Sequence, residues 1–203
     1  MENKLELFFV RHGETEWNQE GRLQGWLDSN LSPHGIKQIT HLKQQLKGIR
    51  FAAAFSSTSN RAIQTAELLV GDYLTIVKDP RLLEIHLGSW QGKRLADIEK
   101  NDRERYNHYF HHPEKYIPDT GESFHQVVHR MGDFLESCAN AFDSGKILAV
   151  SHGVAIRALI LSILRLPIKN IWDFEIEGAS VTKVTITNKT PIIEYIGKTI
   201  SIE

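Results

Sequence analysis

Apolar and polar residues follow one another along the chain in blocks that predict strands and helices. Four short apolar runs end abruptly at polar or turn-forming residues, which is typical of buried strands. Elsewhere, apolar residues recur at the three- and four-residue spacing of an amphipathic helix. The strands are predicted at residues 5–10, 51–55, 74–77 and 146–150, and the helical spacing lies within residues 36–46, 62–69, 122–142 and 154–166.

A helix start and a closing pair of strands complete this pattern. Ser32 before Pro33 has the form of a helix N-cap followed by proline at the first helical position. Residues 181–186 and 192–195 alternate or nearly so, which predicts an antiparallel pair joined at residues 188–191. The predicted fold class is therefore α/β: a doubly wound, mostly parallel sheet with right-handed crossovers and an antiparallel edge strand.

Residues 93–121 differ in composition from the rest of the chain. Charged residues dominate their first part, and the segment returns through Pro113 and Pro118. A helical excursion at the carboxyl ends of the strands would cover a binding site as a lid and carry substrate selectivity. Its aromatic residues, Tyr106, Tyr109, Phe110 and Tyr116, would form a roof suited to an apolar or ring-bearing substrate. We expect one domain over residues 1–203, with this lid inserted at about 93–121.

Composition narrows the possible partners. The net charge is −1, so no overall field recruits nucleic acid or an anionic membrane. The single cysteine, Cys138, excludes an intramolecular disulfide and suits a reducing compartment. The first apolar run is too short for a signal peptide, and no stretch is long enough to span a bilayer. We expect a cytoplasmic protein without a nucleic-acid or membrane partner, either a monomer or a homodimer.

Histidine pairs raise the question of a metal site. His108 and His112 share a predicted helix face, and so do His125 and His129. No carboxylate or cysteine completes either pair at a recognisable metal-ligand spacing, so a solvated face is the better interpretation. No metal and no cofactor is therefore expected.

Basic residues stand where two of the predicted strands end. The first run stops at Arg11-His12-Gly13, and the run 146–150 stops at Ser151-His152-Gly153. In an open parallel sheet the carboxyl ends of the strands lie together and form the ligand site. Arginine forks match the oxygens of a phosphoryl group, so the grouping predicts a phosphate site. Clustered positive charge would also keep one histidine neutral and nucleophilic.

Two further residues extend this site. Arg61 follows the hydroxyl-rich segment 56–59 in the first turn of a predicted helix, where a cation opposes the helix dipole and a bound anion would remove the conflict. One of the preceding hydroxyl residues is expected to cap this helix. Glu84 lies between apolar residues, either turned to solvent at an edge or in a partly buried pocket that favours its protonated form.

Four motifs in this order resemble the histidine phosphatase superfamily, the phosphoglycerate mutase-like group, over essentially the whole chain. They are Arg11-His12-Gly13-Glu14-Thr15 with Asn18, Ser59-Asn60-Arg61-Ala62-Ile63-Gln64-Thr65-Ala66, Leu83-Glu84-Ile85 with Gly88 and Gly92, and Ser151-His152-Gly153. The resemblance implies that His12 becomes phosphohistidine, that Glu84 gives a proton to the leaving group, and that no metal takes part. It assigns the phosphoryl oxygens to Arg11, Asn18, Arg61 and His152. Gln24 falls where the phosphatase branch lines its phosphate pocket, and Gly25 and Gly153 complete the expected substrate-binding set.

The acceptor of the phosphoryl group is a separate question. Phosphoglycerate mutases of this superfamily carry a tyrosine and a lysine at the positions of Leu87 and Leu95, a Phe-Thr pair at Leu23-Gln24, and a longer, more basic insertion. This chain departs at all four points, so water is the expected acceptor. It looks most similar to the small bacterial broad-specificity phosphatases. The alternatives are an α-ribazole phosphate phosphatase, a cofactor-dependent phosphoglycerate mutase and a non-catalytic phosphate-binding module.

Overall fold

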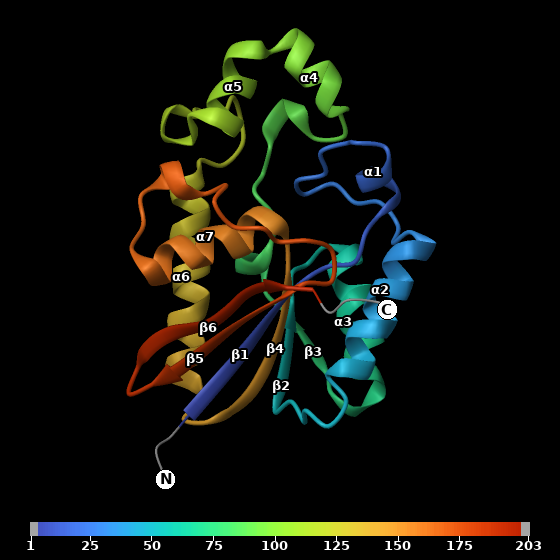
Figure 1. Cartoon of the computed structure of the whole chain (residues 1–203), viewed down its shortest axis with the longest axis vertical. Coiled ribbons are helices and arrows are strands. Elements are labelled where there is room, and N and C mark those ends of the chain that lie inside the picture. The colour runs from blue at the N-terminus through green and yellow to red at the C-terminus, as the bar shows by residue number, and fades with distance from the viewer. Residues whose placement is uncertain (1–3, 200–203) are drawn as a thin grey trace.

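The computed structural model describes residues 4–199, whose strands form one mixed sheet (Figure 1). The strand order is β3-β2-β4-β1-β5-β6. The first four in this order are parallel, whereas β5 is antiparallel to β1 and β6 to β5. The strands are β1 (Lys4–Arg11), β2 (Ala53–Ser56), β3 (Ile76–Lys78), β4 (Gly145–Ser151), β5 (Val181–Thr187) and β6 (Thr190–Lys198). The predicted mostly parallel α/β fold is confirmed.

Helices cover both faces of this sheet, with α2 and α3 on one side and α6 and α7 on the other (Figure 1). The α-helices are α1 (Glu16–Gln19), α2 (Pro33–Gln45), α3 (Asn60–Val70), α4 (Leu95–Asn101), α5 (Arg103–His111), α6 (Phe124–Ala141) and α7 (Gly153–Leu164). Short 3-10 turns are η1 (Gly71–Tyr73), η2 (Pro80–Leu82), η3 (Gly88–Trp90), η4 (Pro113–Lys115) and η5 (Ile168–Asn170).

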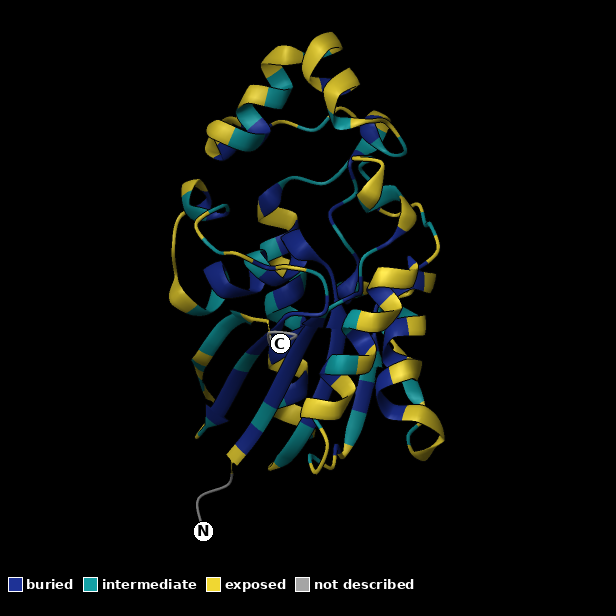
Figure 2. Ribbon diagram, turned by 45° about the vertical axis from the view of Figure 1, so that its right-hand side comes forward, coloured by how far each residue is buried: buried dark blue, intermediate teal, exposed yellow. Residues whose placement is uncertain are grey.

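The apolar run of β1 is explained by burial on both faces of the sheet. Leu7 and Phe9 belong to the core shared with α6 and α7, whereas Phe8 and Val10 belong to the core shared with α2 and α3. Successive side chains of a strand point to opposite faces, so a strand covered on both sides is apolar throughout. Figure 2 shows this pattern: the central strands β1 and β4 are largely buried, whereas the edge strands β3 and β6 and the outer faces of the helices are more exposed.

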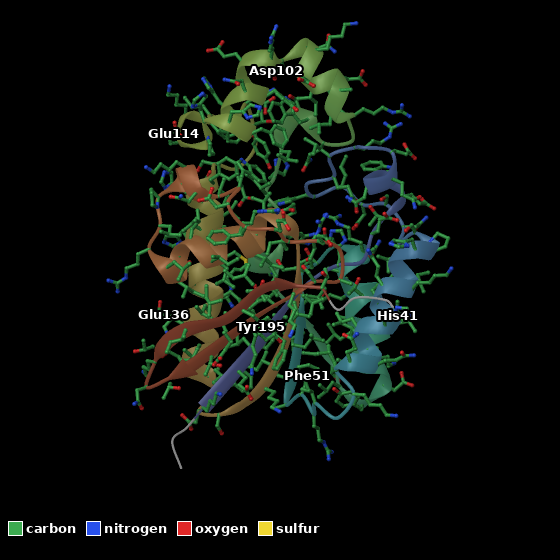
Figure 3. The ribbon with its side chains drawn as sticks, viewed as in Figure 1. His41, Phe51, Asp102, Glu114, Glu136 and Tyr195 are labelled. Carbon is green, nitrogen blue, oxygen red and sulfur yellow. The ribbon has the colours of Figure 1, made fainter. Side chains whose placement is uncertain are left out.

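The segment predicted as a lid is formed by α4, α5 and η4, beyond the carboxyl ends of the parallel strands (Figure 1). Tyr109 of α5 packs its ring against Trp90 and Phe124, with centroids 5.6 and 5.0 Å apart. The lid therefore shares the core of α6 and α7. Asp102 and Glu114 lie on it, at the opposite end of the molecule from Phe51 (Figure 3).

The strand predicted at residues 51–55 is β2, at Ala53–Ser56, and the start of β3 and the connection between β5 and β6 also differ from the sequence-based prediction. β3 begins at Ile76 and not at residue 74, because the 3-10 turn η1 and its exit occupy the preceding residues. The connection between β5 and β6 has two residues instead of the predicted four. Asn188 and Lys189 both have positive φ (51° and 62°), as a tight hairpin turn requires, and Thr190 already pairs with Thr187.

Two helix ends also differ. The helix predicted to continue to residue 166 ends at Leu164, because Arg165 adopts a left-handed φ of 53°. The helix predicted from residue 122 begins at Phe124. Ser123 is its N-cap and forms a capping box with Gln126.

Candidate active site

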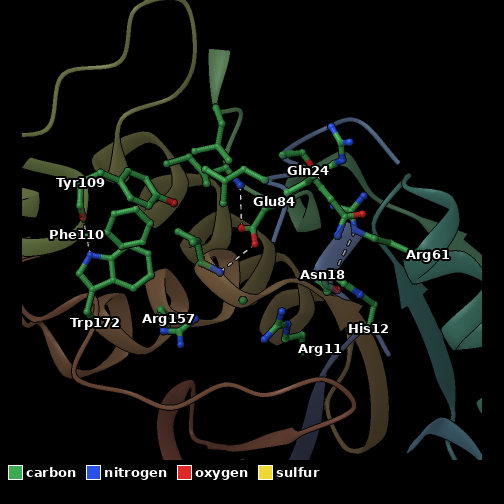
Figure 4. A pocket seen from close by; sticks show the side chains of 17 residues that line it. Arg11, His12, Asn18, Gln24, Arg61, Glu84, Tyr109, Phe110, Arg157 and Trp172 are labelled. Carbon is green, nitrogen blue, oxygen red and sulfur yellow. Dashed lines mark hydrogen bonds between the residues drawn. The ribbon is translucent and has the colours of Figure 1, made fainter. Parts of the chain in front are cut away.

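A cavity of about 190 Å³ opens at the carboxyl ends of β1 and β4, between the sheet and the lid (Figure 4). The loop that follows α1, the segment around Glu84, and helices α3, α5 and α7 also contribute to its wall. Every candidate site residue from the sequence lines this cavity except His152, which lies beneath it and is fully buried.

His12 follows the last residue of β1 and is held in one tautomer. Its Nδ1 lies 2.7 Å from the carbonyl oxygen of Gly13, so Nδ1 carries the proton and donates it. Its Nε2 accepts a hydrogen bond from Arg61 Nε at 3.3 Å, which requires a free lone pair on that nitrogen. Burial, reinforced by the charges of Arg61 and Arg11, lowers the pKa of His12 well below its ordinary value. The expectation of a neutral, oriented histidine is thus met by these contacts.

Gly13 makes this position of His12 sterically possible. A Cβ on Gly13 would lie 2.7 Å from Ile39 Cδ1 and 2.8 Å from the carbonyl oxygen of Gly35. Any side chain here would push the end of β1 away from α2, which is why the chain turns through glycine.

Arg61, the second residue of α3, is 1% exposed and uses all five of its N–H donors within the protein. Its acceptors are His12 Nε2 at 3.3 Å, Leu27 O and Asp28 Oδ1 at 2.7 Å, Gly25 O at 2.8 Å and His152 Nδ1 at 3.1 Å. Burial lowers the pKa of Arg61, and the carboxylate of Asp28 opposes that shift. The guanidinium is therefore fixed in place before any substrate arrives.

The anion expected at the start of α3 is supplied by the chain itself. Asp28 Oδ2 accepts a hydrogen bond from the backbone N–H of Asn60 at 2.7 Å, and Asp28 Oδ1 accepts one from Arg61 N at 3.4 Å. The prediction that a hydroxyl residue caps this helix is wrong: Ser59 occupies the N-cap position, but its side chain makes no capping bond. Asp28 takes that role and also balances the charge of Arg61.

The hydroxyl groups before α3 serve His152 instead. Ser57 Oγ lies 2.7 Å and Ser59 Oγ 3.3 Å from His152 Nε2. His152 Nδ1 accepts from Arg61, so Nε2 carries the proton and donates it to these hydroxyl groups. Burial, followed by the charge of Arg61, lowers the pKa of His152 well below its ordinary value. In this structure the contact of His152 is with Arg61, and its ring lies 5.0 Å from that of His12.

Arg11 and Asn18 complete the end of the cavity nearest His12. Arg11 Nη1 donates to Ile176 O at 2.7 Å, and its buried Nε has no hydrogen-bond partner in the part of the chain that the structure describes. Asn18 Oδ1 accepts from the backbone and hydroxyl of Thr15 at 3.0 and 2.9 Å, which leaves its amide nitrogen free to donate. Gln24 Nε2 donates to Thr15 Oγ1 at 2.9 Å.

Glu84 lies across the cavity from His12, at the N-terminus of α7. Its Oε1 accepts from Ile85 N at 2.9 Å and Ala155 N at 3.1 Å, and its Oε2 accepts from Val154 N at 3.1 Å. The sequence left open whether Glu84 turns to solvent at an edge or lies in a partly buried pocket. The structure places it in the wall of the cavity, with its carboxylate bound by three backbone N–H groups.

A partly buried ion pair that the sequence did not reveal holds the backbone around Glu84. Arg130 of α6 binds both carboxylate oxygens of Glu122 at 2.8 and 2.9 Å. Arg130 also donates to the carbonyl oxygens of Arg81, Leu83 and Glu84 at 2.6 to 3.0 Å. Glu122 Oε2 accepts from His86 N at 2.9 Å on the other side of Glu84. An arginine in an amphipathic helix pattern carries no sequence signal of this role.

Aromatic residues form the far wall of the cavity (Figure 4). Phe110 is stacked on Trp172 with ring centroids 5.5 Å apart, and Trp172 Nε1 donates to Tyr109 O at 2.6 Å. Of the predicted roof, Tyr109 and Phe110 line the cavity, whereas Tyr106 and Tyr116 pack beside it. Trp172 and Arg157 were missed. Trp172 follows α7 in a segment without a periodic pattern, and Arg157 is a lone arginine within α7, which carries no sequence signal of this position.

Comparison with known proteins identifies the family. A family model described as histidine phosphatase superfamily (branch 1) matches residues 7–199. The chain belongs to the histidine phosphatase superfamily. It is 31% identical to phosphoserine phosphatase 1 of Hydrogenobacter thermophilus, over 93% of this chain and 90% of that protein. It is also 31% identical to a probable phosphoglycerate mutase, GpmB, of Proteus mirabilis, over 91% and 86%.

A solved structure confirms the family and the fold. Bacillus stearothermophilus YhfR superposes with a TM-score of 0.93 at 35% sequence identity, covering 97% of this chain and 98% of that one. As a member of the histidine phosphatase superfamily with such relatives, the chain is a phosphatase. Among residues 4–199, no three or more His, Cys, Asp and Glu side chains are grouped so that they could bind a metal. Within that same range no helix combines the length and hydropathy needed to cross a bilayer.

The two neutral histidines predict how stability depends on pH. Both have a lower pKa in the folded protein than the value near 6.5 expected in the unfolded chain, so the unfolded state binds more protons at mildly acidic pH. We expect the free energy of unfolding to fall as the pH drops below about 6.5, by up to about 1.4 kcal/mol per pH unit for each histidine. Urea denaturation at several pH values measures this slope.

Substituting single histidines shows which of them causes the pH dependence of the free energy of unfolding. His12→Gln should flatten the dependence between about pH 6.5 and 5 by the share of one histidine. His34→Gln, at an exposed position on α2, is the matched control and should leave the slope as it is. An unchanged slope in His12→Gln would contradict the view that His12 is neutral in the folded state.

Proposed function

We propose that this phosphatase transfers the phosphoryl group of a small phosphomonoester to His12 Nε2 and then to water. The observation that carries the proposal is the neutral His12, with its proton fixed on Nδ1 and its Nε2 lone pair beside Arg61. A histidine held this way divides one difficult displacement into two easier ones.

The contacts of Arg61 support the first step. In the resting site Arg61 Nε donates to the lone pair of His12 Nε2. When that lone pair forms the bond to phosphorus, the same N–H is released and can donate to a phosphoryl oxygen. The unpartnered Arg11 Nε and the free amide of Asn18 are further donors at this end of the cavity. Such fixed donors stabilise the charge that develops on the equatorial oxygens.

Glu84 is proposed as the acid and base of the two steps. Three backbone N–H groups hold the carboxyl group of Glu84 at the cavity wall, within the same cavity as His12. Protonated Glu84 gives its proton to the leaving alkoxide as the bond from phosphorus to oxygen breaks. The resulting carboxylate accepts a proton from the water that attacks phosphohistidine, which restores Glu84 and releases phosphate from His12.

Water as the second acceptor is supported by the lining of the cavity. Leu87 lines the cavity, and Leu95 begins α4. Neither side chain can bind an anion. Arg105, a partly buried basic residue of the lid, is paired with Asp102 and with Asp119. The other basic lid residues are exposed: Lys93, Arg94, Lys100, Arg103 and Lys115.

The cavity volume and the composition support a small metabolite as substrate. About 190 Å³ lies below the roughly 300–1,000 Å³ of pockets for drug-sized ligands, so a compact phosphomonoester fits better than the nucleotide-sized α-ribazole phosphate. The net charge of −1 and the buried Cys138 support a cytoplasmic enzyme without a nucleic-acid partner. We propose that no metal is required.

The covalent intermediate is the first test. Rapid quenching during turnover, in excess EDTA, should trap an acid-labile and base-stable phosphoryl adduct on His12. His12→Ala should give no adduct and lose turnover, whereas His34→Ala, at an exposed position, should match the wild type. An adduct that maps to His152, or turnover that EDTA abolishes and one divalent ion restores, would show the mechanism to be wrong.

The role of Glu84 can be tested by varying the leaving group. Glu84→Gln keeps the shape of the side chain but cannot supply the proton. We expect the rate on an alkyl phosphate to fall by about 10²- to 10⁴-fold, and the rate on p-nitrophenyl phosphate to fall far less, because nitrophenolate departs without help. Steady-state kinetics on both substrates measure this difference, and equal losses would show that Glu84 only supports the structure.

The acceptor is tested by following two products together. The enzyme receives 3-phosphoglycerate with catalytic 2,3-bisphosphoglycerate, and both 2-phosphoglycerate and inorganic phosphate are measured. We expect phosphate release from its best alkyl or aryl phosphate to exceed isomerisation by at least about 100-fold, a barrier difference of about 2.7 kcal/mol. Faster isomerisation would identify a mutase and refute water as the main acceptor.

A further inference from the structure

Arg157 is an arginine of the cavity wall whose charge has no ion-pair partner among residues 4–199. Its Nε donates to Phe174 O at 2.8 Å, and its guanidinium carbon lies 5.4 Å from the centroid of the Trp172 ring. These two contacts fix the plane of the group. Its terminal nitrogens, Nη1 and Nη2, form no hydrogen bond or ion pair with any residue between 4 and 199. The side chain lines the cavity, so these donors are open to a ligand (Figure 4).

Three other arginines in or beside the site are already paired with carboxylates. Arg61 uses every donor within the protein, and Arg130 is bound to Glu122. Arg22, which also lines the cavity, is paired with Glu20 at 2.5 Å and donates to Gly92 O at 3.0 Å. Arg11 keeps an unpartnered donor too, but it stands beside His12 at the end that receives the phosphoryl group.

The surroundings of Arg157 favour an anion. Burial and the neighbouring charge of Arg11 lower the pKa of Arg157, and the charge of Glu84 opposes them. The two guanidinium groups flank Gly153, where an added Cβ would lie 3.1 Å from Arg157 Nη1 and 3.7 Å from Arg11 Cζ. A half-buried cation beside a second cation is unfavourable until a counter-charge arrives.

The position of Arg157 assigns that counter-charge to the leaving group. Glu84 protonates the bridging oxygen, so the alcohol part of the substrate lies between Glu84 and the aromatic wall of Tyr109, Phe110 and Trp172. Figure 4 shows Arg157 beside that wall, between Trp172 and Arg11. The Tyr109 hydroxyl has no partner within the described chain, and burial raises the pKa of Tyr109, so it remains a donor.

We infer that the alcohol part of the substrate carries a carboxylate, which Arg157 binds through Nη1 and Nη2. This inference rests on the proposed function and specifies its substrate class. A carboxylate is a small planar group that matches the arginine fork, and it suits a cavity of about 190 Å³. Arg157 is thereby a residue that determines specificity, and the aromatic wall covers the short carbon chain.

A matched pair of substrates tests this inference. In 3-phosphoglycerate a carboxylate stands where glycerol 3-phosphate has a hydroxymethyl group. We expect wild-type kcat/KM to favour 3-phosphoglycerate, and Arg157→Met to lower it by about 10- to 100-fold on that substrate, mainly through KM, because a charged hydrogen-bond pair is lost. On glycerol 3-phosphate the kcat/KM of the same variant should differ from the wild-type value by less than about 3-fold.

Two further variants and one further substrate distinguish a failure of the carboxylate inference from a failure of the phosphatase mechanism. Arg157→Lys retains the charge without the fork and should recover part of the preference for the carboxylate. Arg22→Met, the matched control at a cavity arginine already paired with Glu20, should change kcat/KM on both substrates by the same factor. Equal losses on the two substrates in Arg157→Met would overturn the inference. Turnover of p-nitrophenyl phosphate shows that each variant folds, and its absence in the wild type would instead refute the proposed phosphatase mechanism.

Discussion

The buried guanidinium of Arg61 is the interaction on which the whole site depends. It joins the nucleophile at the end of β1, the supporting histidine at the end of β4, and the loop of residues 25–28, each through a hydrogen bond to a fixed acceptor. A buried cation is tolerated only when its donors are satisfied and its charge is balanced, and Asp28 supplies the balance. The fold therefore brings these segments together around one charge.

This arrangement also decides the protonation of the site. Each histidine accepts a hydrogen bond from Arg61 through an unprotonated ring nitrogen. Neither can therefore take a second proton without losing its hydrogen bond from Arg61. The nucleophile and its support are consequently neutral without any help from a substrate. Burying and orienting these polar groups costs free energy. That cost is offset during folding by the burial of β1 and β4 between two layers of helices.

Much of this architecture was predictable because it follows from periodicity. The apolar runs of β1 and β4 and the helical spacing of α6 located the core. The basic residues at strand ends drew attention to His12 and His152, and the cation in the first turn of a predicted helix drew attention to Arg61. The Arg130–Glu122 pair, Asp28 and Arg157 were not predictable in their roles. Their partners lie far away in sequence, and each contact is made with a backbone group or through tertiary packing. Such contacts leave no local pattern for sequence analysis to detect.

The contacts of Glu84 with α6 and α7 mean that the two reacting groups are held by different elements of the fold. His12 directly follows β1, whereas the backbone of Glu84 is bonded to α6 through Arg130 and its carboxylate to the first turn of α7. The distance between nucleophile and acid therefore depends on how these helices pack on the sheet, for example where Phe134 of α6 meets Phe9 of β1 with ring centroids 6.1 Å apart. Because a close-packed core transmits changes in side-chain volume, catalytic geometry and core volume cannot evolve independently in this chain.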